Sequence, residues 1–177
     1  MVIRMAVDVI MERVPVASRW VSEKWQPAAV VPVGEPTAGT GASTPGTPRL
    51  LHDGADCTQW CFPGCALELH PSEAEGYFLN ISSPRMGVFV MWRRFEDAGG
   101  PPARPAVVTL SYDEAARMMD GGEQVDLVPM APRIHEWLVE FVAEHYKPEP
   151  KKKLRRRDPL AADGPADPNQ DQRLRRP

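Results

Sequence analysis

The sequence predicts an α+β domain in which an antiparallel sheet packs against a short helix and a C-terminal amphipathic helix. Short segments rich in Val, Trp and Phe recur about every ten residues with turn signals between them, which is typical of an antiparallel meander. The last apolar segment instead repeats at helical spacing. A meander closed by a helix also fits a barrel-like curl, so a pleckstrin-homology-like barrel stays an open alternative.

The first expected strands follow a short extension. Residues 1–12 are expected to lie outside the domain, which would begin at residue 13. The stretch "ASRWVSEKW" (17–25) predicts a strand. Gln26-Pro27 is expected to bend the chain into "AAVVPV" (28–33), where Pro32 indicates an edge strand because proline cannot donate to a ladder.

The middle of the chain predicts three further strands separated by turns. "CALELH" (65–70) alternates, with Cys65, Leu67 and Leu69 on one face, and "HPSEAEG" (70–76) predicts a turn. "YFLNIS" (77–82) predicts a strand with three apolar residues on one side: Tyr77, Leu79 and Ile81. Two more strands are expected at "GVFVMWRRF" (87–95), buried on both faces near its start, and "AVVTL" (106–110).

A capping box predicts the short helix that follows. In Ser111-x-x-Glu114 the serine hydroxyl is expected to accept a backbone N–H, and the glutamate to reach back to the cap. Gly121 is expected to supply the left-handed end. One apolar stripe is expected along the helix: Tyr112, Ala115, Ala116 and Met119.

The C-terminal part of the domain predicts a short strand and the strongest helix. "EQVDLVPM" (123–130) reads as the strand, and Pro132 suits the first turn of the helix. Burying the five hydrophobic residues of the helix would contribute roughly 8–15 kcal/mol of transfer free energy. Its apolar stripe along 133–146 comprises Ile134, Trp137, Leu138, Phe141, Val142 and His145.

Composition sets the domain limits. The domain is expected at 13–147, with flexible insertions at 34–48 and 96–105 and a disordered basic tail at 148–177. Residues 147–177 carry ten Lys/Arg and five Asp/Glu, which leaves 11 basic and 19 acidic residues, a net of −8, in residues 1–146. An acidic body with a basic tail is the main electrostatic feature.

The same composition points to the cytoplasm. Three cysteines do not make a disulfide scaffold, which favours a reducing compartment. No apolar run is long enough to span a membrane, and the start of the chain lacks the pattern of a signal peptide.

The cysteines are the weak candidates for a metal site. Cys57, Cys61 and Cys65 are flanked by His52 and His70. Their x₃ spacing does not match the C-x₂-C pattern of zinc knuckles, and the Pro-Gly pair at 63–64 is expected to prevent one strand from aligning them. No metal and no cofactor is therefore expected.

Catalytic motifs give no better candidate. Ser82 and Ser83 with the acids Glu73, Glu75 and Asp126 lack any pattern that fixes their geometry. No nucleophile elbow and no phosphate-cradling loop occurs. Of the two histidines on the last helix, His135 and His145, only His145 joins the apolar stripe, where a partly buried histidine at the core edge is expected. We therefore expect a protein that is not an enzyme.

Protein binding remains, through tryptophans and the basic tail. Trp20, Trp25 and Trp60 are candidates for a binding face, where Trp is enriched. The tail run adds Lys151, Lys152, Lys153, Arg155, Arg156 and Arg157. The basic run has no interleaved aromatic residue that could stack on bases. A regulator that binds specific nucleic acid through its tail is therefore the least favoured of the three functions.

Four stretches together resemble an uncharacterised proteobacterial family that carries a domain of unknown function. They are "MERVPVASRWVSEKW", "ELHPSEAEGYFLNISSPRMGVFVMWR", "SYDEAARMMDGGEQVDLVPM" and "WLVEFVAEHYKPEPKKK". The family is encoded near genes for molybdenum-dependent formate dehydrogenase. The resemblance covers most of residues 11–153 and transfers no catalytic residue.

The resemblance implies an accessory or maturation role for a molybdenum-dependent redox enzyme, exerted by binding an enzyme subunit or a maturation chaperone. The alternative is a small enzyme of molybdenum cofactor (molybdopterin-guanine dinucleotide) biosynthesis. The chain lacks the N-terminal Gly-rich loop that such nucleotidyltransferases carry, which favours the accessory role.

A chain truncated after Tyr146 is expected to keep its thermal stability, because the residues beyond it carry almost no apolar side chains. Circular dichroism melts of the full and shortened chains measure this. A fall in Tm of more than about 5 °C would show that the tail stabilises the domain.

Overall fold

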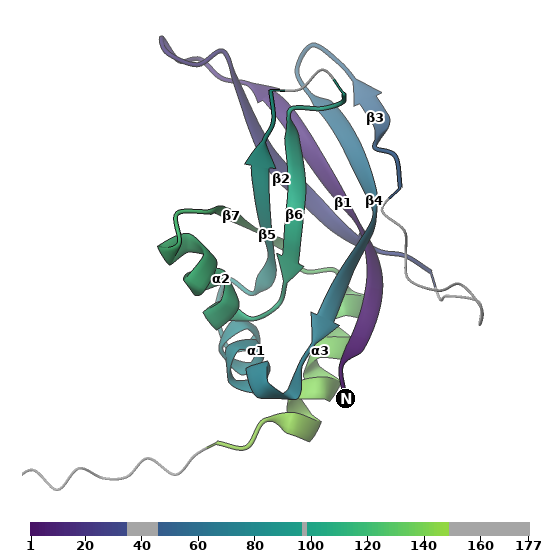
Figure 1. Cartoon of the computed structure of the whole chain (residues 1–177), viewed down its shortest axis with the longest axis vertical. Helices are drawn as coiled ribbons and strands as arrows, with labels where there is room; N and C mark the ends of the chain where they lie inside the picture. The colour runs from purple at the N-terminus through teal and green to yellow at the C-terminus, as the bar shows by residue number, and fades with distance from the viewer. Residues whose placement is uncertain (35–45, 97–98, 149–177) are drawn as a thin grey trace, which may run out of the picture. The chain divides into compact units, whose positions relative to one another are not determined.

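The computed structural model describes residues 1–34, 46–96 and 99–148, and residues 1–146 form one compact unit. The fold is α+β, as expected, with two antiparallel sheets and three helices. Figure 1 shows the helices gathered at one end of the strands. One hydrophobic core joins both sheets and the last helix.

The first sheet is built around β1. Its order is β2-β1-β4-β3, where β1 is Ile3–Pro15, β2 Glu23–Pro32, β3 Arg49–Asp53 and β4 Thr58–Leu69. Val7, Val9 and Met11 of β1 are fully buried. The expected extension at 1–12 is therefore corrected, because its alternating residues supply the central strand. The interrupting charges that suggested an extension lie on the opposite side of that strand.

The second sheet is smaller and has the order β6-β5-β7. Strand β5 (Gly87–Arg94) is buried over its first six residues, which confirms the expected strand at 87–95. Its neighbours are β6 (Ala103–Thr109) and β7 (Gln124–Pro129), where strands were also expected. Hydrogen-bonded pairing does not join the two sheets within the described residues, so the expected single meander is divided into two layers.

Helix α3 (Pro132–His145) confirms the strongest periodic signal. Ile134, Leu138, Phe141 and Val142 are buried, and Pro132 occupies the first turn. The helix packs on α1 (Ala74–Ile81), where the ring of Phe141 meets Tyr77 edge-on at 5.8 Å.

Helix α1 replaces the strand expected at 77–82, and that expectation is wrong. Pro71 begins a 3₁₀ turn, Pro71–Glu73, that leads into the helix. Alternation of Tyr77, Leu79 and Ile81 suggested a strand, but Leu79 is exposed. The packed positions instead follow the i, i+3, i+4, i+7 spacing of a helix: Ala74, Tyr77, Phe78 and Ile81.

Strand β2 also differs from its expected limits. Residues 16–22 connect β1 to β2 and are not part of a strand, whereas Pro27 lies inside β2. The chain continues through Pro27 because the ladder shifts register there, opposite Ile10 and Met11. The edge position expected for Pro32 is confirmed.

Helix α2 (Tyr112–Asp120) begins at the expected cap but ends and packs differently. Gly121 has φ −74° and Gly122 φ +83°, so Gly122 supplies the left-handed residue. The N–H of Glu123 donates to Met118 O at 3.1 Å, which completes a Schellman ending. Of the expected stripe only Ala115 is buried, because the helix lies at the margin of the core.

Parts of the expected insertions at 34–48 and 96–105, namely residues 35–45 and 97–98, lie outside the described residues. Most of the expected tail at 148–177 lies outside them as well. In the insertion expected at 96–105, Pro101 and Ala103 are buried and β6 has already begun. No helix in the described part of the chain has the length and apolarity to cross a membrane.

Asn80 links α1 to the second sheet. Its side-chain amide donates to Gly87 O and Leu110 O, both at 2.8 Å, and accepts from Gly87 N at 3.1 Å. The amide is buried and its hydrogen bonds hold the starts of β5 and of the connection after β6.

Replacing Asn80 by Ala is expected to lower the free energy of unfolding by about 2–4 kcal/mol, because three hydrogen bonds are lost and buried backbone groups are left unpaired. Urea unfolding measures the change. The control, Ser82→Ala at an exposed position of the same helix end, should change stability by less than about 0.5 kcal/mol. Equal effects of the two variants would contradict this role for Asn80.

Candidate functional site

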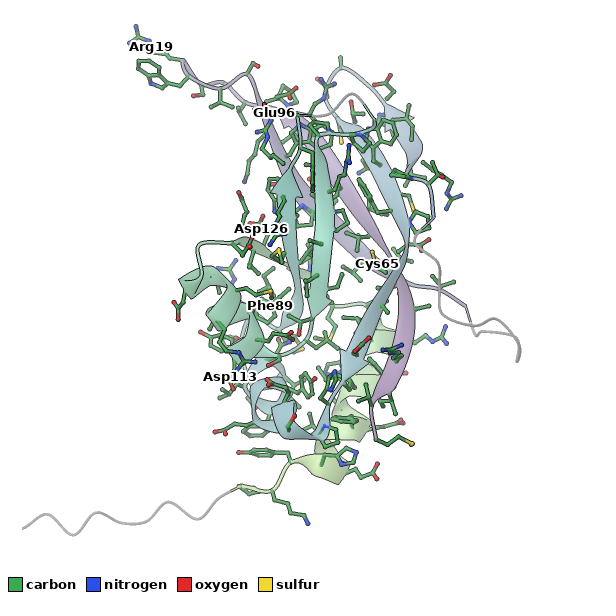
Figure 2. All side chains as sticks on the ribbon, in the orientation of Figure 1. Arg19, Cys65, Phe89, Glu96, Asp113 and Asp126 are labelled. Atoms are coloured by element: carbon green, nitrogen blue, oxygen red, sulfur yellow. The ribbon has the colours of Figure 1, made fainter. Side chains whose placement is uncertain are left out.

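The candidate site is a groove between β4 and β6, here called the β4–β6 groove. It has a volume of about 420 Å³ and is lined by β4 residues between Pro63 and His70, by Pro105–Thr109 of β6 and by Glu114 of α2. Cys65, labelled in Figure 2, is one of the lining residues. The groove separates the two sheets on one side of the core.

Both walls of the groove are strand edges. Within the described residues β3 pairs with Thr58–Cys61 of β4, and the second half of β4 pairs with β1 alone. Strand β6 is an edge strand that pairs with β5. Backbone groups of both strands therefore point into the groove, because alternate residues of a strand direct their amides to each side.

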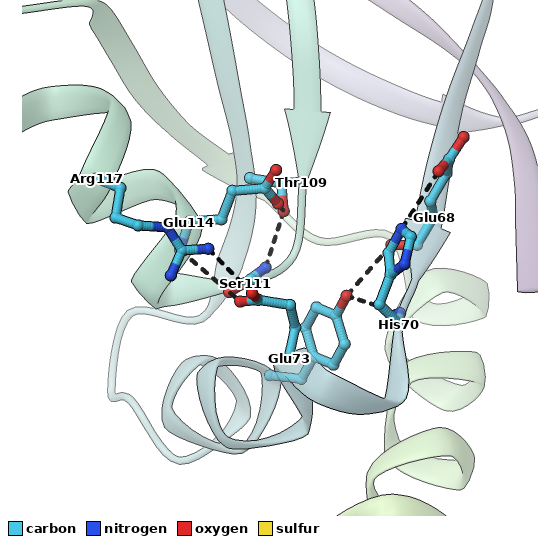
Figure 3. A network of polar contacts seen from close by, with 8 residues as sticks. Glu68, His70, Glu73, Thr109, Ser111, Glu114 and Arg117 are labelled. Carbon is cyan, nitrogen blue, oxygen red and sulfur yellow. Dashed lines mark hydrogen bonds and ion pairs between the residues drawn. The ribbon is translucent and has the colours of Figure 1, made fainter. Parts of the chain in front are cut away.

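A polar network closes the helical end of the groove (Figure 3). The Ser111 hydroxyl accepts from Glu114 N at 3.1 Å, as expected for the cap, and donates to Glu73 Oε2 at 2.8 Å. The second hydrogen bond of the capping box, from Ser111 N to the Glu114 carboxylate, was expected to be direct, and the structure corrects this. Ser111 N donates to Thr109 Oγ1 at 3.1 Å, and that hydroxyl donates to Glu114 Oε2 at 2.5 Å. Thr109 thus stands between the cap and the glutamate.

Glu73 joins two helices. Its second oxygen accepts from Arg117 Nη2 of α2 at 3.0 Å, while the first holds the Ser111 hydroxyl. The approach requires Gly76 on α1, since a Cβ there would lie 2.4 Å from Ser111 Oγ. Glu73 is thereby held as a structural ion pair.

A second polar group lies on the β4 side. His70 Nε2 is 3.3 Å from Glu68 Oε2, and Arg4 pairs with Glu68 at 2.8 Å. The Tyr77 hydroxyl donates to Glu68 O at 3.4 Å and accepts from His70 N at 3.1 Å. Burial raises the pKa of Tyr77, so it stays a neutral phenol at physiological pH.

The three cysteines are free thiols: Cys57 lies just before β4, and Cys61 and Cys65 lie within it. Strand β4 runs through Pro63-Gly64 without ending, contrary to expectation, because Gly64 adopts φ +82° at a register shift opposite Asp8. Cys61 pairs with half-buried Ile10, whereas Cys65 pairs with fully buried Val7. Their side chains therefore point to opposite faces.

Each thiol is hard to ionise. Burial raises the pKa of Cys61 and Cys65, and the carboxylate of Asp8 raises both further. Burial and Glu12, whose Oε2 lies 3.8 Å from the sulfur, raise the pKa of Cys57. Thiols of this kind are poor nucleophiles. In residues 1–34, 46–96 and 99–148 no three His, Cys, Asp or Glu side chains are arranged to hold a metal ion.

The other candidates from the sequence are scattered. Trp20 is 91% exposed in the connection between β1 and β2, Trp60 is half-buried, and Trp25 is a core residue at 5%. Asp126 accepts from Trp92 Nε1 at 2.7 Å, away from Glu73. The tail candidates lie outside the described residues: Lys151, Lys152, Lys153, Arg155, Arg156 and Arg157.

The structure gives the expected serine and carboxylate candidates structural contacts. The serine beside a carboxylate, Ser111, is fully buried and occupied as a helix cap. Sequence reasoning missed the groove and the role of Glu73, because both depend on segments distant along the chain. Only the Ser-x-x-Glu pattern signalled one end of the network.

Comparison with known proteins yields one family. The family model described as "Protein of unknown function (DUF3305)" matches residues 6–156. Neither a curated protein nor a solved structure matches the chain.

Replacing Asp8 by Asn is expected to speed alkylation of Cys61 and Cys65 by iodoacetamide at pH 8 about two- to fivefold, because removing the charge lowers both thiol pKa values. Cys57, which neighbours Glu12, serves as the internal control and should not change. Site-resolved mass spectrometry measures the rates. Equal acceleration at all three thiols would indicate loosening of the strand.

The same shifts set a pH dependence of stability. The pKa values of the Cys61 and Cys65 thiols are raised in the folded state. Their contribution to the free energy of unfolding is therefore fully present below the ordinary thiol pKa of 9.0 and is lost as the pH rises above that value.

Proposed function

The chain belongs to the DUF3305 family of proteins of unknown function, and we propose that it is a non-enzymatic accessory or maturation protein that binds another protein. The partner we propose is a subunit or maturation chaperone of a molybdenum-dependent redox enzyme, formate dehydrogenase. We place this binding in the cytoplasm, because three free thiols fit a reducing compartment.

The β4–β6 groove carries this proposal. It presents a hollow of about 420 Å³ between two strand edges that have no partner strand among the described residues. Glu68 is paired with Arg4 and lies beside His70, whereas Glu114 accepts from the neutral Thr109 hydroxyl. A surface with free backbone groups and no aligned nucleophile and base supports recognition of a protein chain over catalysis.

The choice of partner rests on the gene neighbourhood that the resemblance implies. The exposed Trp20 supports a second point of contact, since tryptophan is enriched in the energetic centres of interfaces.

A small enzyme of molybdenum cofactor biosynthesis is the second candidate. It is favoured by one observation, the presence of Cys65, Glu68, His70 and Glu114 around one hollow. Isothermal titration with GTP and with molybdopterin-type ligands discriminates the two: the accessory role predicts no heat of binding.

Affinity purification of the tagged chain from its natural host is expected to recover formate dehydrogenase subunits or a chaperone of that enzyme, and deletion of the gene is expected to reduce formate dehydrogenase activity. Cells grown with tungstate in place of molybdate test whether recovery depends on the cofactor. A deletion strain with normal activity would contradict the proposed role.

A further inference from the structure

We propose that the β4–β6 groove binds an extended peptide segment of its protein partner as an added β-strand, and that this segment carries a Lys or Arg side chain that pairs with Glu114. The inference rests on the proposed function, protein binding, and specifies how the partner is held.

The first argument is the supply of backbone hydrogen bonds. The Pro63 carbonyl accepts from Gly46 N at 3.2 Å, so among residues 1–34, 46–96 and 99–148 the stretch of β4 without a partner on this side begins at Gly64. Across the groove, Pro105 has no N–H, and the open stretch of β6 is Ala106–Thr109. In the described part of the chain neither wall pairs with another strand on its groove side, so an added strand would gain hydrogen bonds on two sides, where an ordinary sheet edge offers one.

Strand direction supports the same occupant. In Figure 1 the arrows of β4 and β6 both point to the helical end of the domain. A segment that enters with the opposite direction is antiparallel to both walls. Antiparallel pairing is the slightly more stable arrangement per residue, so one peptide orientation suits both edges.

The lining leaves room for such a segment. Ala66 of β4 and Ala106 of β6 are exposed and small, and Gly64 has no side chain. Ala106 also lies at the register shift of β6, where it has no partner residue on β5. Alternate side chains of an added strand can then turn inward to Cys65 and Val108 or outward to solvent.

Charge selects a basic segment. Among the described residues, the charged or titratable lining residues other than Cys65 are Glu68, His70 and Glu114, and none of the lining residues is Lys or Arg. Arg4 already neutralises Glu68 at 2.8 Å. In the described residues the hydrogen bond to the Glu114 carboxylate comes from the neutral Thr109 hydroxyl. A Lys or Arg side chain of the bound segment would therefore give the Glu114 carboxylate a charged hydrogen-bond donor.

The test uses purified full-length protein and a random heptapeptide phage library as the probe. Enriched peptides are synthesised and their affinities measured by fluorescence anisotropy. We expect enriched peptides to carry Lys or Arg within a stretch of β-formers, and Glu114→Gln to weaken binding about three- to tenfold. Glu140→Gln on the exposed side of α3 is the matched control and should leave binding unchanged.

A second pair of variants tests the groove itself. Ala106→Arg, which fills and charges the groove, should weaken binding at least about tenfold, while Ala143→Arg at an exposed position of α3 should not. Ala66→Arg replaces Ala106→Arg if circular dichroism shows loss of fold. Hydrogen exchange should show new protection at Ala106–Thr109 and in the second half of β4, which binding through side chains alone would not produce.

Absence of enriched peptides overturns the inference, and so does binding that Ala106→Arg and Ala66→Arg leave intact. A dimer that sedimentation detects and Ala106→Arg dissociates would assign the groove to a second copy of the chain and likewise overturn it. If peptides bind but formate dehydrogenase is not recovered from cells, the proposed partner fails and the strand addition stands. If the Ala106→Arg variant recovers the enzyme as well as the unchanged chain does, the proposed partner stands and the strand addition fails.

Discussion

The pairing of β1 on both of its sides is the constraint on which the rest of the domain depends. Its fully buried residues fix the inner face of the first sheet, and its register with β4 contains the shift opposite Asp8. That shift turns Cys61 and Cys65 to opposite faces, and in the described residues the pairing of β4 with β3 ends at Cys61. The open edge of β4, and with it the β4–β6 groove, follows from this arrangement.

Much of the fold could be predicted from the sequence where the signal is local. The buried run of β5, the stripe of α3 and the Ser111 cap each depend on neighbouring residues and are confirmed. Helix α1 was mistaken for a strand because a six-residue window fits both periods, and only the wider spacing from Ala74 to Ile81 distinguishes them. Strand β1 was overlooked because Arg4 and Asp8 interrupt its apolar pattern, although they occupy its outward positions.

The candidate site was beyond reach of the same reasoning. Its walls are contributed by β4 and β6, about 40 residues apart, and no local pattern reports that their edges face each other. Glu73 meets Ser111 only after α1 and α2 have packed, so its role has no sequence signature. The thiols, which attract attention in the sequence, have raised pKa values and lie beside acids.

Asn80 has a consequence for recognition. It holds Leu110, the residue that follows β6, and Gly87, where β5 begins, so one wall of the groove is fixed to α1 by buried hydrogen bonds. Widening the groove would break these bonds inside the core. The width is therefore preorganised, and an incoming segment loses its own conformational entropy without having to order its receptor as well.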